Sequence, residues 1–151
     1  MIYLIQYFYY ILSEGRLYMK YELTKDLETG NSLIDREHRE LFAAINDLMD
    51  ACSKGKGRDR IADTTRFLTN DVSKHFRDEE QLQIQSKYPT YSMHRQFHEK
   101  YKMDLAQVGN ELNTAGPTLA VLNKLNHVVG VLITHIRIED KKLAVHVKNS
   151  K

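Results

Sequence analysis

The sequence predicts an all-α protein, an up-down-up-down antiparallel four-helix bundle with an N-terminal arm. The 151 residues suit a single domain, and only 7 glycines and 2 prolines interrupt the chain. Apolar side chains recur at helical spacing through four long segments, and no strand pattern competes there. Because short connections between long amphipathic helices favour antiparallel neighbours, these observations together predict the bundle.

The first two helices are expected at residues 32–52 and 58–85. The first carries an apolar face and ends at the glycine- and lysine-rich run at residues 53–57. The second has a longer apolar stripe that stops before Pro89, because proline cannot continue a helix.

The third and fourth helices are expected at residues 91–112 and 118–147. Between them, the Asn-Thr-Ala-Gly-Pro run at residues 113–117 is a typical C-cap and stop signal. Residues 19–31 are expected to form the arm, packed across one end of the bundle.

Residues 1–18 are expected to be an N-terminal extension of the bundle domain at residues 19–151. Residues 1–12 are apolar and aromatic but too short for a membrane-spanning helix of about 20 residues, and they lack the features of a secretory signal. One interpretation is a segment that lies on a membrane surface. The favoured one is an over-called start: codons 14–16 can contain a ribosome-binding sequence, so that translation would begin at Met19.

Composition excludes several classes of protein. Twenty-two Lys and Arg against 20 Asp and Glu leave a net charge of +2, too balanced for a nucleic-acid-binding surface. A single cysteine, Cys52, excludes a disulfide framework, thiolate zinc sites and iron–sulfur clusters. We therefore expect a cytoplasmic protein with no membrane span, in which histidines and carboxylates must hold any metal.

The seven histidines are the most informative residues. His38 lies on the apolar face of the first expected helix. The second helix offers His75 and Glu79 and the third offers His94 and His98, each pair four residues apart and so on one helical face. Taken alone, His38 has the ordinary alternative of a hydrogen-bonded histidine. The alternative for His75 and Glu79 is a surface pair, and the alternative for His94 and His98 is a pair of zinc ligands. The HRQFH run lacks the glutamate of the zinc metalloprotease motif.

The fourth expected helix offers His135 and Asp140, five residues apart. Residues at this spacing lie about 140° apart around an ideal helix. Both side chains can therefore reach one site only if the helix widens or bends locally. His127 and His146 have no partner at a suitable spacing and are expected at the surface or near helix ends.

Together, the four helices would bring seven residues of ligand type into one bundle core, where buried polar groups need the partners that a metal supplies. Four ligands satisfy zinc, whereas five imidazoles and two carboxylates suit two carboxylate-bridged iron ions with an open position. Few anionic ligands leave the iron less electron-rich, which favours reversible O2 binding over O–O cleavage. One alternative is that copper or zinc occupies the site on affinity alone, and the other is a bundle without metal.

These motifs resemble the hemerythrin family, in particular its single-domain bacterial members, the bacteriohemerythrins. The resemblance covers residues 19–147. It rests on TGNSLIDREHRELF around His38, HFRDEE around His75, YPTYSMHRQFH around His94 and HIRIED around His135. It implies a cofactor of two iron ions and O2 as the ligand.

The resemblance also implies a role for each residue. One iron would be held by His94, His98 and His135. The other iron, which would bind O2, would be held by His38 and His75. Both would be bridged by Glu79, Asp140 and an oxo or hydroxo group. The apolar oxygen pocket would be formed by Leu41, Phe76, Val131, Leu132 and Ile136.

The chain departs from the family in having no tryptophan. Tyr21 stands where the leader usually has one, and Val131 takes a pocket position that is aromatic in some members, which would open a path for solvent. The expected function is an O2 carrier, store or scavenger rather than an enzyme, because no acid or base group is placed at the pocket. The alternative is an O2, NO or redox sensor. The expected partners are O2 and an unidentified oxidase or signalling protein.

Overall fold

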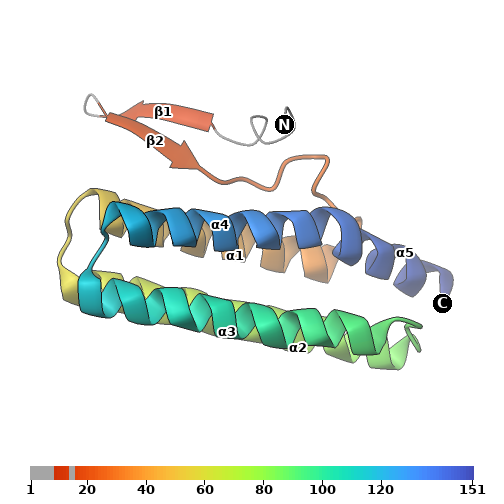
Figure 1. The fold of residues 1–151 in the computed structure, drawn as a ribbon. Coiled ribbons are helices and arrows are strands. Elements are labelled where there is room, and N and C mark those ends of the chain that lie inside the picture. The colour runs from red at the N-terminus through yellow and green to blue at the C-terminus, as the bar shows by residue number, and fades with distance from the viewer. Residues whose placement is uncertain (1–8, 14–15) are drawn as a thin grey trace.

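Four long antiparallel helices form the body of the molecule (Figure 1). The computed structural model describes residues 9–13 and 16–151, with side chains from Lys20 onward. The helices are α1 (Ser32–Ser53), α2 (Arg58–Gln85), α3 (Tyr91–Ala115) and a fourth made of α4 (Leu119–His135), η1 (Ile136–Asp140) and α5 (Lys141–Asn149). Consecutive helices are in contact. The predicted four-helix bundle is confirmed.

Local signals set the helix ends. The side chain of Asn31 caps α1 by accepting hydrogen bonds from the backbone N–H groups of Leu33 and Ile34. Helix α3 continues three residues beyond the expected end and stops at Gly116, whose φ of +76° suits glycine. Thr118 then caps α4 through its hydroxyl oxygen.

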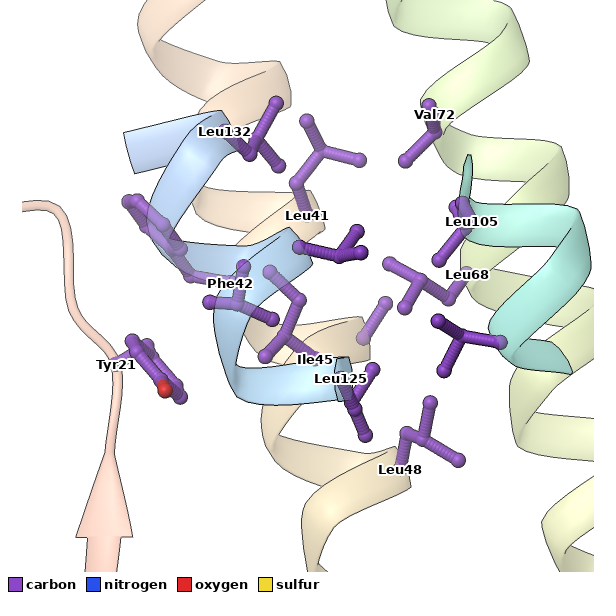
Figure 2. Close-up of a cluster of buried hydrophobic side chains, with 14 of the residues drawn as sticks. Tyr21, Leu41, Phe42, Ile45, Leu48, Leu68, Val72, Leu105, Leu125 and Leu132 are labelled. Atoms are coloured by element: carbon purple, nitrogen blue, oxygen red, sulfur yellow. The ribbon is translucent and has the colours of Figure 1, made fainter. Parts of the chain in front are cut away.

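Two apolar clusters hold the helices together. The larger one fills most of the bundle, and Figure 2 shows part of it. The smaller one, which we call the end cluster, lies where α1 and α3 begin and α2 ends. It consists of Ile34, Tyr88, Leu143, Ala144 and Val147. The bundle thus has apolar packing on both sides of the level at which the histidines occur.

The arm runs along the bundle rather than across one end as predicted. Tyr21 is 4% exposed and belongs to the main cluster, facing the helices that carry Phe42 and Leu125 (Figure 2). Its backbone N–H donates to Asn46 Oδ1 at 2.8 Å, and Asn46 Nδ2 donates back to its carbonyl at 2.8 Å. Since Asn46 is more than three turns into α1, the arm lies alongside this helix.

A β-hairpin precedes the arm, which the sequence analysis did not predict. Strand β1 (Tyr9–Ser13) pairs antiparallel with β2 (Arg16–Lys20), with Ser13 opposite Arg16. Tyrosine and isoleucine favour strands. The proposed start at Met19 and the membrane-surface segment concern residues that lie largely outside the described part of the chain, so both stay predictions.

The fourth helix is long and apolar enough, by length and composition, to cross a membrane. In this molecule it is one of the four helices around the core, and Leu125, Val129 and Leu132 on it are buried in the main cluster. Its place in the bundle accounts for its apolar composition.

We predict that Tyr21→Ala lowers the free energy of unfolding by about 3 kcal/mol, because a buried aromatic side chain is lost from the core. Chemical denaturation measures this, with Tyr21→Phe as the control that keeps the ring. A loss below about 1 kcal/mol would mean that the arm does not stabilise the bundle.

Candidate metal centre

The four helices bring the seven expected ligand residues together in one buried cluster. Their side chains are almost completely buried. They form two groups, in each of which the ligand atoms lie within 4.8 Å of one another. One group contains Glu79, His94, His98 and His135; the other contains His38, His75, Glu79 and Asp140. Their roles as iron ligands stay predictions, but each group has the residues to hold a metal ion.

All five imidazoles turn the same nitrogen, Nε2, toward the two carboxylates. Nε2 lies 3.1 Å from Asp140 Oδ2 in His38 and 2.9 Å from Asp140 Oδ1 in His135. In His98 it lies 3.3 Å from Glu79 Oε2. In His75 it lies 3.7 Å from Glu79 Oε1. Five inward nitrogens around two carboxylates make a site for cations.

The two carboxylates each reach both groups. Asp140 turns Oδ2 toward His38 in one group and Oδ1 toward His135 in the other. Glu79 approaches His75 through Oε1 and His98 through Oε2. A carboxylate that offers one oxygen to each of two ions is the arrangement needed to bridge a metal pair.

The local widening that the five-residue spacing required is present. Residues Ile136–Asp140 form a turn of π-helix, in which hydrogen bonds span five residues rather than four. The wider turn places His135 and Asp140 on the same face of the helix, with His135 Nε2 2.9 Å from Asp140 Oδ1.

The buried groups shift one another's ionisation strongly in the protein without metal. Burial disfavours the charged form of each, but the attraction between imidazolium and carboxylate prevails. The neighbouring Glu79 and Asp140 raise the pKa of His75 to about 10 and that of His94 to about 9. These histidines in turn lower the pKa of Glu79 to about 2. Without metal, protons on the imidazoles balance the carboxylates.

Several buried atoms at the centre have no hydrogen-bond partner among the described residues. They are both carboxylate oxygens of Glu79, Oδ1 of Asp140 and the Nε2 atoms of His75 and His98. Buried polar atoms are normally paired, and each of these faces the middle of the cluster. Nitrogen and carboxylate donors of this kind fit iron, so the residues present suit a pair of iron ions.

Two glutamates that the sequence analysis missed support the cluster from behind. His75 Nδ1–H donates to Glu37 Oε2 at 3.1 Å, and His98 Nδ1–H donates to Glu80 Oε1 at 3.0 Å. Each fixes the tautomer that leaves Nε2 free for a metal. Burial opposes ionisation of Glu37, but hydrogen bonds from His75 and Lys74 lower its pKa to about 2. Because each pair joins different helices, no spacing in the sequence indicates it.

Four of the five expected pocket residues are buried in the main cluster: Leu41, Phe76, Leu132 and Ile136. The ring of Phe76 stacks on His98 with centroids 3.8 Å apart. Val131 is only half-buried and lines two surface grooves of about 470 and 500 Å³, the second of which also contacts His135. The pocket itself stays a prediction, and Val131 is its point nearest to solvent.

The two remaining histidines lie outside the cluster. His127 is exposed on α4. His146 is near the end of α5, half-buried, and its Nε2–H donates to the carbonyl oxygen of Ser86 at 2.8 Å. Both were expected at the surface or near a helix end.

Comparison with known proteins identifies the family. Residues 29–146 match the family model described as the hemerythrin HHE cation binding domain. The chain is 31% identical to a myohemerythrin of Sipunculus nudus over 73% of this chain and 79% of the relative. It is 27% identical to a bacteriohemerythrin of Campylobacter jejuni over 79% of this chain and 89% of the relative.

The fold, the donor set and this match define a di-iron protein of the O2-binding class. The chain belongs to the hemerythrin family, and relatives named bacteriohemerythrin agree with the resemblance that the sequence motifs indicated.

We predict that iron binding releases protons at neutral pH and strengthens as the pH rises. The iron-free protein holds more protons, because the pKa values of His75 and His94 are about 10 and 9, whereas a ligating Nε2 must be unprotonated. Titration calorimetry in buffers of different ionisation enthalpy counts these protons. Iron binding without proton release between about pH 6 and 8 would contradict the site.

We predict that Glu37→Gln weakens iron binding by about tenfold, because the negative charge behind His75 is lost. Competition with a chelator measures the affinity. Glu40→Gln removes an exposed carboxylate from the same helix and serves as the matched control. Equal affinities in the two variants would show that Glu37 does not support the centre.

Proposed function

We propose that this protein binds O2 reversibly in the cytoplasm, as a carrier, store or scavenger, at a pair of iron ions. The proposed ligands are His38, His75, Glu79, His94, His98, His135 and Asp140. The iron pair would supply the electrons that bind O2. The protein would hold the ions, exclude water and admit the gas.

The observation that most supports this function is the burial of the apolar residues proposed to surround the His38 group. Of the proposed pocket residues, Leu132 and Ile136 are 0% exposed, Leu41 and Phe76 are 1% exposed, and the Phe76 ring lies beside His75 with centroids 5.7 Å apart. Such a wall admits a small apolar gas and disfavours water and anions, whose transfer out of water is costly. Exclusion of water and anions favours release of the bound gas as unreduced O2.

The chain's own residues would do three things. The carboxylates of Glu79 and Asp140 would keep the two ions at a fixed separation. Glu37 and Glu80 would hold two of the imidazoles in the ligating tautomer. The stacked ring of Phe76 would limit movement of His98.

A sensor is the second candidate, and the link between the centre and the arm favours it. Arg137 Nε lies 3.7 Å from Asp26 Oδ2, and Lys141 Nζ donates to the carbonyl oxygen of Asp26. Arg137 lies within η1, and Lys141 directly follows Asp140. A shift of Asp140 on ligand binding would therefore reach the arm, which a partner protein could contact.

The test is a visible spectrum of the reduced protein with its iron quantified, before O2, after O2 and after removal of O2. We expect two irons per chain and an absorption band that appears with O2 and disappears without it. His75→Ala should abolish the band, whereas His127→Ala, an exposed histidine on α4, should leave it intact. Immediate irreversible oxidation in the wild type would contradict O2 carriage and favour the sensor.

We predict that Val131→Leu slows autoxidation of the O2-bound protein several-fold, because a larger side chain would narrow the proposed path for solvent at this half-buried position. The autoxidation rate is measured as the decay of the absorbance of the O2-bound protein, by stopped-flow mixing and by slower absorbance recordings. Val145→Leu, on the exposed face of α5, is the matched control. An unchanged decay rate in Val131→Leu would place solvent entry elsewhere.

A further inference from the structure

The carboxamide of Gln83 is a buried polar group that the ligand set leaves unexplained. Gln83 is 0% exposed, and neither its Oε1 nor its Nε2 has a hydrogen-bond partner among the described residues. An unpaired buried amide destabilises a fold, and such groups usually bond to an enclosed water molecule. Gln83 therefore indicates a site for a hydrogen-bonding guest.

Gln83 lies between the centre and the end cluster. It follows Glu79 by one turn of α2, so it occupies the same helical face. At the same level, Ile34 precedes His38 by one turn, and Leu143 is one turn past the end of η1. The carbonyl oxygen of Gln83 accepts the backbone N–H of Tyr88, a member of the end cluster, at 2.8 Å. Gln83 is thus a polar side chain beside an apolar layer that closes this end of the centre.

His38 and His94 lack the support that Glu37 and Glu80 give to His75 and His98. The Nε2 atoms of His38 and His94 face the carboxylates, so their Nδ1 atoms face away from them. Both Nδ1 atoms are buried, with no partner among the residues the structure describes. When Nε2 ligates a metal, Nδ1 carries the proton and needs an acceptor.

These two donors lie toward the same end of the bundle as Gln83. Side chains on a helix tilt toward its N-terminus, and both α1 and α3 begin at this end, where α2 ends (Figure 1). The ring of Tyr88 contacts that of His94, with centroids 6.2 Å apart, and its backbone bonds to Gln83. Tyr88 therefore adjoins both His94 and Gln83.

We propose that Gln83 is a positioning residue of the metal centre: its carboxamide holds enclosed water that accepts the Nδ1–H hydrogen bonds of His38 and His94. Water can accept from an imidazole and donate to Oε1, while the amide N–H groups donate to water in turn. The water would do for these two imidazoles what Glu37 and Glu80 do for His75 and His98. Because it is neutral, it would fix the tautomer without adding negative charge.

The experiment compares wild type with Gln83→Met, which keeps the volume and removes both polar atoms. Gln85→Met makes the same change at an exposed position two residues further along α2 and is the control. Gln83→Asn keeps a carboxamide and leaves room for water, so it tests rescue. The first readout is solvent exchange of the Nδ1–H protons in iron-free protein labelled with ¹⁵N-histidine. The second is iron affinity by chelator competition.

We expect Gln83→Met to accelerate Nδ1–H exchange of His38 and His94 at least tenfold and to weaken iron binding about 10- to 100-fold. Exchange at His75 and His98 should be unchanged, since their carboxylate partners remain. Gln85→Met should match the wild type, and Gln83→Asn should recover part of the loss.

Unchanged Nδ1–H exchange in Gln83→Met would overturn the proposal. A higher melting temperature with unchanged iron affinity would do the same, because that is the behaviour of a carboxamide without any partner. If Gln83→Met does not fold, the wild type decides: magnetisation transfer from a bound water to the Nδ1–H of His38 or His94 supports the proposal, and its absence overturns it.

The role in iron binding rests on the proposed function, but the two can fail separately. Wild-type protein that binds no iron pair would contradict the proposed function, while the exchange rates in iron-free protein would still decide the role of Gln83. Normal iron and O2 binding in every variant, with unchanged exchange, would contradict the role of Gln83 alone.

Discussion

The burial of five imidazoles and two carboxylates at one level of a four-helix bundle is the constraint on which the rest of the structure depends. Groups of this kind destabilise an apolar core unless each is paired. In the iron-free protein, the carboxylates raise the pKa of His75 and His94, and protons balance the charge. At the proposed centre, a metal pair would replace those protons. The same side chains would therefore serve two states of the protein.

The centre lies near one end of the bundle, so most of the apolar core that stabilises the fold lies apart from the polar residues of the centre. His38 and His94 lie in the first two turns of their helices, and Glu79 lies in the last two turns of α2. Beyond them, the main cluster continues as an apolar core to the other end. The arm stabilises that core through Tyr21. The end cluster closes the opposite side, so the polar level is enclosed by apolar packing in both directions.

Support for the imidazoles is unequal, with physical consequences for the two metal positions. One histidine of each group, His75 or His98, donates to a glutamate. A carboxylate behind an imidazole makes it a stronger donor to a metal, whereas a neutral partner orients it without that effect. Each proposed metal position would thus receive one strengthened ligand. Stronger donation to both would favour the oxidised ions and shorten the life of any O2-bound form.

The sequence by itself determined the fold class, the four helices to within a few residues and the set of candidate ligands, because helical periodicity and the spacing of His75 and Glu79 are local properties. It also required a distortion between His135 and Asp140, which the π-helical turn supplies. Only the tertiary structure decided the partners of Glu37 and Glu80, the burial of Gln83 and the course of the arm along α1. These depend on which faces of different helices meet, and no spacing along one chain encodes a contact between residues such as Glu37 and His75, which lie on separate helices.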